Sequence, residues 1–221
     1  MREIDVSFTP TTTDTRYIKK LGILGKMATT AALFEVFRNP ASVDEVCDCL
    51  NKLLDVRAQW QRQSKRDNSS QLEVQLPKLW ILTPTASKAL LNGFNTTSDT
   101  QNWLRGIYFL GKHLRTAILV IHQLPEIPET LWLRILGRGK VQAKAIRAIA
   151  ALPVDDPERV QTLELVYQLQ LKLRGDRDEQ ELIGEDKELV MAVAPLFQEQ
   201  LAAAEKRGER RGELRGIEQG I

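Results

Sequence analysis

The chain of 221 residues contains only two cysteines, Cys47 and Cys49, and this scarcity excludes a disulfide framework. Their C-x-C spacing inside a helical pattern places the two thiols about 200° apart around the helix, so they do not share a metal ion. We expect one thiol to be buried and the other to be partly exposed. Few cysteines are typical of a protein in a reducing, cytoplasmic compartment.

The sequence signatures of several enzyme classes are also absent. There is no H-E-x-x-H or C-x-x-C pair, and no serine or cysteine lies in a nucleophile elbow. The segment "GRGK" is followed by Val141, whereas a P-loop needs serine or threonine there. His113 and His122 stand alone near predicted loops and strand ends, so neither is assigned a role.

Long hydrophobic runs are missing too. The longest, "AILVI" and "LVMAVAPLF", are far shorter than the ~20 residues that span a bilayer. The N-terminus lacks the basic and apolar segments of a secretory signal. Hydrophobic residues make up 43% and charged residues 27% of the chain, with a net charge of +2, as in ordinary globular proteins. These features predict a soluble cytoplasmic protein with no membrane partner and one main core.

The N-terminal half alternates between predicted strands and helices. Period-2 patterns and β-branched runs predict strands over residues 2–8, 30–40, 78–85, 106–111 and 116–124. Helical patterns cover residues 18–28, 42–66 and 86–94. The helix over 42–66 is the clearest, because Ser42 and Glu45 form a capping box ahead of an apolar stripe.

From Pro125 the pattern becomes helical, with helices predicted over residues 128–139, 140–153 and 157–173. The last segment also alternates as a strand would, but its length and its "DDPER" start favour a helix. We therefore predict an α/β fold with a small mixed sheet and flanking helices, followed by a helical C-terminal region. The predicted parts are an α/β core (1–125), a helical extension (126–175) and a C-terminal helix with a tail (176–221).

The tail carries glycines every four residues, at positions 208, 212, 216 and 220. Each glycine costs a helix up to about 1 kcal/mol relative to alanine, so the segment is marginal as an isolated helix. It is either a solvated low-complexity tail or a helix that packs against a copy of itself. The second alternative predicts a homo-oligomer formed through the C-terminal helix.

Two carboxylates on predicted neighbouring strands form the candidate catalytic site. Asp5 lies within an alternating segment beside the core, where a carboxylate must be solvated, paired or bound to a metal. Glu35 lies on the next strand, and two such acids can hold Mg²⁺ through oxygen ligands. The alternatives are an ordinary outward-facing Asp5 and a Glu35 paired with Arg38 or Arg57.

A basic stretch between Glu129 and Asp155 contains no acid. Its cationic residues are the candidate nucleic-acid ligands Arg134, Arg138, Lys140, Lys144 and Arg147. The last three follow i, i+4, i+7 spacing on one side of the predicted helix. Such a ridge can contact DNA phosphates, and a solvated helix face is the alternative.

Several blocks resemble one known family: "EIDVSFTP", "LGILGKMATTAALFEVFRNP", "LPKLWILTPTASKALL", "GIYFLGKHLRTAILVIHQLP" and "ETLWLRILGRGKVQAKAIRAIAALP". That family is abundant in cyanobacteria and is similar to the Rpn-like transposases and recombination-promoting nucleases of the PD-(D/E)XK superfamily. The resemblance implies a metal-dependent DNA endonuclease, with Asp5 and Glu35 as catalytic residues and Mg²⁺ ligands. A chain that starts directly on the first strand also implies a truncated form of this core.

The superfamily places a lysine two residues after its second acid, where this chain has Phe37. The resemblance therefore implies a nuclease fold that is degenerate at the catalytic lysine. The alternative function is a non-catalytic module for protein interaction or oligomerisation on the same fold.

Overall fold

A computed structural model of the chain is divided into two compact units, residues 1–137 and 138–221. The described residues are 5–10, 15–66, 76–153, 156–157 and 159–165, with the isolated positions 195, 196, 198 and 202.

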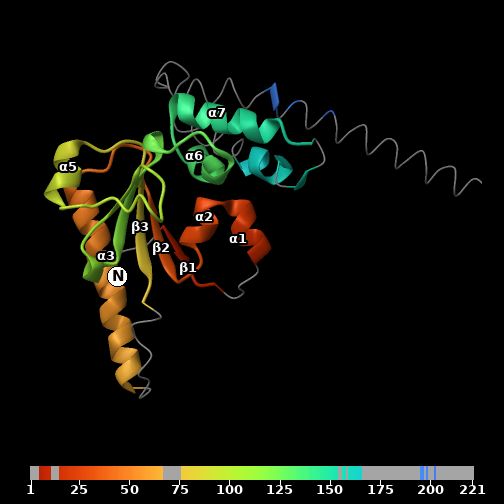
Figure 1. Cartoon of the computed structure of the whole chain (residues 1–221). Coiled ribbons are helices and arrows are strands. Elements are labelled where there is room, and N and C mark those ends of the chain that lie inside the picture. Colours follow the sequence, from red (N-terminus) through yellow and green to blue (C-terminus); the bar gives the residue numbers. More distant parts are fainter. Residues whose placement is uncertain are drawn as a thin grey trace, which may run out of the picture. The chain divides into compact units, whose positions relative to one another are not determined.

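The first unit is built on a five-stranded mixed sheet of strand order β1-β2-β3-β5-β4 (Figure 1). Its strands are β1 (Val6–Phe8), β2 (Ala32–Val36), β3 (Lys78–Thr83), β4 (Ile107–Phe109) and β5 (Thr116–Val120). The three central strands, β2, β3 and β5, are parallel, and β1 and β4 pair antiparallel with the outer two of them. The mixed α/β fold predicted from the sequence is confirmed.

The helices among the described residues of the first unit are α1 (Thr15–Leu21), α2 (Ile23–Met27), α3 (Val43–Arg66), α5 (Lys88–Gly93) and α6 (Leu131–Ile135). The described residues of this unit also form three short 3-10 helices, η1 (Lys112–Leu114) between β4 and β5, η2 (Ile121–Gln123) after β5, and η3 (Pro128–Thr130) before α6. Parallel strands need a long crossover connection, and α3 supplies it between β2 and β3. α3 lies on one side of the sheet and the α1–α2 pair on the other (Figure 1).

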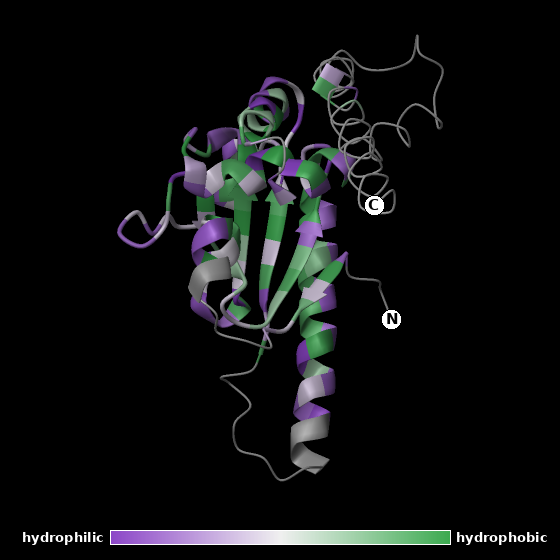
Figure 2. Ribbon diagram, turned by 90° about the vertical axis from the view of Figure 1, so that its right-hand side faces the viewer, coloured by the Kyte–Doolittle hydropathy of each residue, from purple (hydrophilic) through white to green (hydrophobic). Residues whose placement is uncertain are grey.

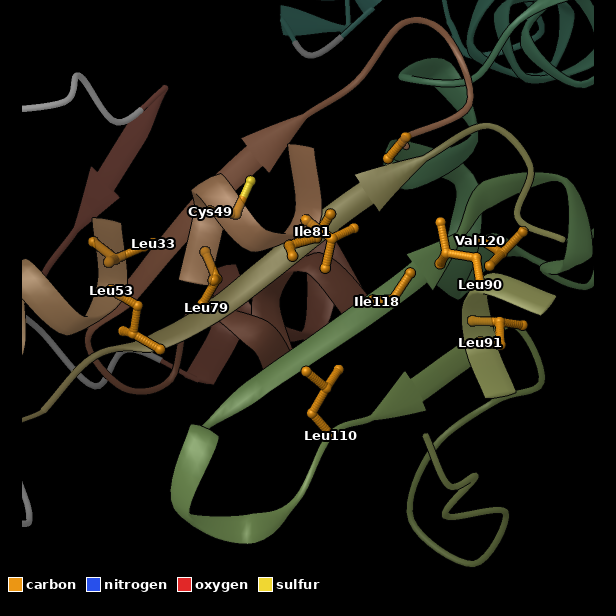
Figure 3. Close-up of a cluster of buried hydrophobic side chains, with 12 residues drawn as sticks. Leu33, Cys49, Leu53, Leu79, Ile81, Leu90, Leu91, Leu110, Ile118 and Val120 are labelled. Carbon is orange, nitrogen blue, oxygen red and sulfur yellow. The ribbon is translucent and has the colours of Figure 1, made fainter. Parts of the chain in front are cut away.

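The main core lies between α3 and the sheet. Figure 2 shows hydrophobic residues along the central strands and many hydrophilic ones along α3. The side chains of Leu79, Ile81 and Ile118 are fully buried, and Figure 3 shows Leu79 and Ile81 near Cys49 of α3 and Ile118 on the next strand. β5 is buried along its whole length, which explains why its sequence is a continuous apolar run.

Gly22 interrupts the helix predicted over residues 18–28 and divides it into α1 and α2. Its φ angle is +57°, a conformation that favours glycine. A Cβ at this position would clash with the backbone of Glu129, so glycine also allows a close approach to the chain before α6.

The predicted capping box at the start of α3 is confirmed. The Ser42 N–H donates to Glu45 Oε2 at 2.7 Å, and the Glu45 N–H donates to Ser42 Oγ at 3.2 Å. These bonds satisfy amide groups that have no partner within the helix. Because the Ser42 backbone and hydroxyl bonds favour its charged form, the pKa of Glu45 lies below its ordinary value.

Replacing Ser42 with alanine should lower the free energy of unfolding by about 1 kcal/mol, the usual effect of losing an N-cap. Urea denaturation of the whole chain at pH 7 measures this change. Ser98→Ala, the same substitution at an exposed loop position, is the matched control and should change the midpoint little. Equal midpoints for the two variants would contradict the prediction.

The described part of the second unit is helical. α7 (Gly139–Ala150) buries one face, with Ala145, Ile146 and Ile149 inside. Residues 157 and 159–165 are also helical, so the helix predicted over 157–173 is confirmed as far as the chain is described, whereas the alternating stretch that suggested a strand lies outside the described residues after Leu165.

Candidate functional site

Asp5 lies one residue before β1, the edge strand that pairs with β2. Val6 is registered with Phe34, so the next step along the ladder places Asp5 opposite Glu35. Asp5 is exposed, and its Oδ2 accepts a hydrogen bond of 2.9 Å from the Val36 N–H. The backbone of β2 therefore holds the Asp5 carboxylate beside the position of Glu35.

Glu35 is a buried carboxylate on the α3-facing side of β2. Glu35 is 2% exposed, and it is paired in register with Ile81 of β3. Its Oε2 accepts a hydrogen bond of 2.8 Å from Lys52 Nζ, and the two groups form an ion pair. Its Oε1 is buried and has no hydrogen-bond partner among the described residues. A buried carboxylate oxygen without a partner is costly, and it retains lone pairs that can bind a cation.

Lys52 is the residue that sequence reasoning missed. The superfamily pattern directs attention to the position two residues after Glu35, which is Phe37, whereas the lysine that meets Glu35 comes from α3, 17 residues further along the chain. The predicted alternative partners were Arg38 and Arg57, and the structure gives Lys52 this role instead. A signal was present in the sequence, because Lys52 lies next to Leu53 in the apolar stripe of the long helix.

The charges around Lys52 keep its ammonium protonated. Burial works to lower the pKa of Lys52, but the hydrogen bond and the charge of Glu35, helped by Asp5, raise it overall. Cys49, one turn earlier on α3, is buried, and burial together with the Glu35 charge raises the pKa of its thiol to about 12. Cys49 therefore stays a neutral thiol at ordinary pH, and Cys47 is exposed, as the C-x-C spacing predicts.

The donor set suits a hard divalent cation. Within the described parts of the chain, no group of three or more His, Cys, Asp or Glu side chains is gathered as a metal site. Mg²⁺, however, is commonly held by one or two carboxylates together with waters and substrate phosphates. The Oε1 of Glu35, which has no hydrogen-bond partner in the described part of the chain, and the neighbouring Asp5 carboxylate fit that requirement.

The basic stretch divides into buried and exposed residues. Arg134 and Arg138 are 6% and 9% exposed. Arg134 donates from Nε to Thr130 Oγ1 at 3.1 Å and from Nη2 to the Ile127 carbonyl at 3.2 Å, so its guanidinium serves the local backbone. Burial leaves these two guanidinium groups less accessible to a DNA phosphate than the exposed cations of α7, and their role as phosphate ligands stays a prediction.

Lys140, Lys144 and Arg147 are exposed on α7, as their spacing predicts. Together they form the α7 basic ridge. The other face of α7 is formed by buried side chains, which include alanines and isoleucines.

Three further points concern the C-terminal tail, membrane-spanning helices and similarity to known proteins. The glycine-periodic tail, and with it the homo-oligomer prediction, lies outside the described residues. Among the described helices, none has the length and apolar character needed to cross a bilayer. Comparison with protein-family models, curated proteins and solved structures finds no match to this chain.

Proposed function

We propose that this chain is a PD-(D/E)XK nuclease-like protein that cleaves DNA with a divalent metal ion, of the transposase or recombination-promoting type. The observation that carries the proposal is the buried Glu35 carboxylate, which is paired with Lys52 through one oxygen and has no described partner at the other. Asp5 lies at the neighbouring ladder position. Two acids and a lysine are the residue types that this chemistry requires.

Asp5 and Glu35 are the residues that would hold Mg²⁺. When bound, the ion would polarise the scissile phosphate and make an attacking water more acidic. The β2 backbone orients Asp5 through the Val36 N–H, and Lys52 orients Glu35 through its ion pair. These contacts set the directions of both carboxylates before substrate arrives.

Lys52 acts as a cation in this proposal. Its raised pKa keeps the ammonium charged at neutral pH, so it does not serve as a general base. A fixed ammonium beside the acids stabilises negative charge that develops on a phosphate oxygen. Lys52, supplied by α3, would thus take the role of the lysine that the superfamily has at the position of Phe37.

The α7 basic ridge would bind the DNA backbone. Changing Lys140, Lys144 and Arg147 together to glutamine should weaken binding to duplexes of any sequence. The magnitude of the slope of log K against log salt should fall by about 2 to 3, because each lost phosphate contact contributes about 0.9. Fluorescence anisotropy over a range of salt concentrations measures this slope.

The matched control changes three exposed cations outside α7, Arg105, Lys88 and Lys112, to glutamine. For this control, the slope of log K against log salt should be closer to that of the parent chain than the slope of the α7 triple variant is. Equal losses for the two triple variants would mean that general charge, not the α7 basic ridge, determines binding.

The proposed function is tested by incubating supercoiled plasmid with the whole purified chain in Mg²⁺, in Mn²⁺ and with excess chelator. We expect nicked and linear products with either metal and none with chelator. Absence of cleavage in both metals would leave the Glu35–Lys52 pair as a structural element and favour the non-catalytic interaction module.

A further inference from the structure

A pocket opens between α3 and the chain segments that lead into β3 and β5. Its open volume, with the solvent at its mouth included, is about 250 Å³. Sites for drug-sized ligands usually have about 300 to 1,000 Å³, so this pocket suits a smaller molecule. Two arginines, Arg57 and Arg115, contribute to its lining together with His113 of η1. We call it the α3–η1 pocket.

The rest of the lining is apolar and consists of Leu53, Leu54, Leu76, Pro77 and Leu114. Leu54 of α3 and Leu114 of η1 remain 48% and 40% exposed, although both are large apolar residues. The other three are buried. Apolar side chains that stay exposed beside a pocket favour the binding of an apolar group, because that group removes them from water.

The two arginines give the α3–η1 pocket a positive charge. Arg57 donates from Nη1 to the His113 carbonyl at 3.5 Å, and Arg115 donates from Nη2 to the Leu76 carbonyl at 2.7 Å. Neither guanidinium forms an ion pair with a carboxylate of the described residues, and the lining of the pocket contains no acid. Backbone carbonyls therefore orient the guanidinium groups without neutralising them. Partly buried cations in this state favour an anionic ligand.

The backbone of Arg115 is held in an unusual conformation. Its φ angle is +47°, in the left-handed region that residues other than glycine rarely adopt. Such a conformation persists where the surrounding structure enforces it, and it is frequent at ligand sites. The Leu79 N–H donates to the Arg115 carbonyl at 2.9 Å, and Arg115 Nε donates to the Pro77 carbonyl at 3.5 Å. Backbone and side chain of Arg115 are therefore both fixed before a ligand arrives.

The α3–η1 pocket is separate from the proposed nuclease site. Pro77 comes just before β3, whereas Glu35 is registered with Ile81, further along the same strand. At ~3.3 Å per residue, the two positions lie about 13 Å apart along the sheet. Neither candidate metal ligand lines the pocket, so its ligand is not explained by the metal chemistry.

We propose that the α3–η1 pocket binds a small aliphatic carboxylate with a chain of about four to six carbon atoms. The carboxylate accepts hydrogen bonds from the guanidinium groups of Arg57 and Arg115, whose planar geometry matches its two oxygens. The aliphatic chain packs against Leu54 and Leu114. An amine would be repelled by the two cations, and inorganic phosphate has no apolar part to contact the leucines.

The test measures binding of pentanoate to the whole chain by ligand-observed NMR titration at pH 7, where the acid is ionised. Pentan-1-ol has a similar chain without the charge, and acetate has the charge without the chain. We expect each of these two to bind at least about tenfold more weakly than pentanoate, because each loses one part of the recognition.

Arg57→Gln removes one guanidinium group and should weaken pentanoate binding about tenfold or more. Its bond to the His113 carbonyl is long, at 3.5 Å, so the fold depends little on it. Arg62→Gln, the same substitution at an exposed position of α3, is the matched control and should bind pentanoate as the parent chain does. Leu114→Ala keeps both cations and should reduce the preference for pentanoate over acetate.

Several results would overturn the proposal. Absence of pentanoate binding would do so directly, and equal affinities for pentanoate and either reference compound would mean that the charge or the chain is not recognised. Displacement of pentanoate by an equal concentration of inorganic phosphate would indicate a general anion site. If Arg57→Gln binds pentanoate as well as Arg62→Gln, the ligand lies elsewhere. These measurements involve no DNA cleavage, so their outcome is independent of the proposed function.

Discussion

Replacing Lys52 with methionine should lower Mg²⁺-dependent plasmid nicking by about a hundredfold or more. Loss of a single group that stabilises developing charge usually has an effect of this size. The methionine side chain is similar in length to the apolar stem of lysine, and the substitution removes the ammonium next to Glu35. Glu35→Gln and Asp5→Asn should each remove the metal-dependent reaction, because each takes away one anionic oxygen ligand.

Two controls separate this effect from general loss of charge. Lys112→Met removes an exposed lysine on η1, and Asp55→Asn removes an exposed carboxylate on α3. Both should nick plasmid within about threefold of the parent rate, as expected for surface positions away from the site. If Lys52→Met retains the parent rate while Glu35→Gln loses it, Lys52 only supports the position of the carboxylate.

The same ion pair should dominate a second measurement, the free energy of unfolding. Lys52→Met leaves the buried Glu35 carboxylate with no partner among the described residues at either oxygen, and breaking such a pair typically costs about 3 kcal/mol or more. The double variant Glu35→Gln with Lys52→Met removes both charges. Its stability should return to within about 1 kcal/mol of the parent, since neutral residues of similar size replace the pair.

Urea denaturation followed by tryptophan fluorescence measures this cycle at pH 7. All four tryptophans, Trp60, Trp80, Trp103 and Trp132, lie in the first unit, so the signal reports on the unit that contains the pair. Additive effects of the two substitutions would mean that the pair contributes nothing as a unit. The stable double variant should also be inactive in nicking, which distinguishes loss of chemistry from loss of folding.

The stabilising effect of the pair should disappear in alkali. The pKa of Lys52 is higher in the folded chain than in the unfolded chain, where a lysine has a pKa of about 10.4. The contribution is therefore complete below about pH 10 and is lost as the pH rises through the folded value. Cys49 adds a separate loss that begins near the ordinary thiol pKa of 9.0, because its folded pKa of about 12 keeps the thiol protonated while unfolded thiols ionise.

Local patterns in the sequence predicted most of the elements. The Ser42–Glu45 capping box and the apolar stripe after it located α3, and the continuous apolar run located β5, because it is buried on both faces. Alternation identified β1 and β2 and placed Glu35 on the same side as Leu33, which the structure confirms. Each of these signals is a periodicity or a cap within one segment, so it can be recognised in the sequence without knowledge of the tertiary structure.

The basic stretch illustrates where such signals fail. Arg134 and Lys140 are both cationic residues in one acid-free segment, yet Arg134 is buried and Lys140 is exposed. Arg134 satisfies its guanidinium with the Thr130 hydroxyl and the Ile127 carbonyl within the same turn region. Composition cannot distinguish the two, because burial depends on which side of each helix meets the rest of the chain.

The sequence by itself determined the mixed α/β class, the helix and strand order of the described residues, and the nearness of Asp5, just before β1, to Glu35 on β2. Only the tertiary structure decided that the lysine of this group is Lys52 and that one oxygen of Glu35 remains without a described partner. The physical reason is that periodicity acts within a segment, whereas this contact joins a strand to a helix. Its existence depends on the register at which α3 packs on the sheet, and a shift of one residue along that helix would turn Lys52 away from Glu35.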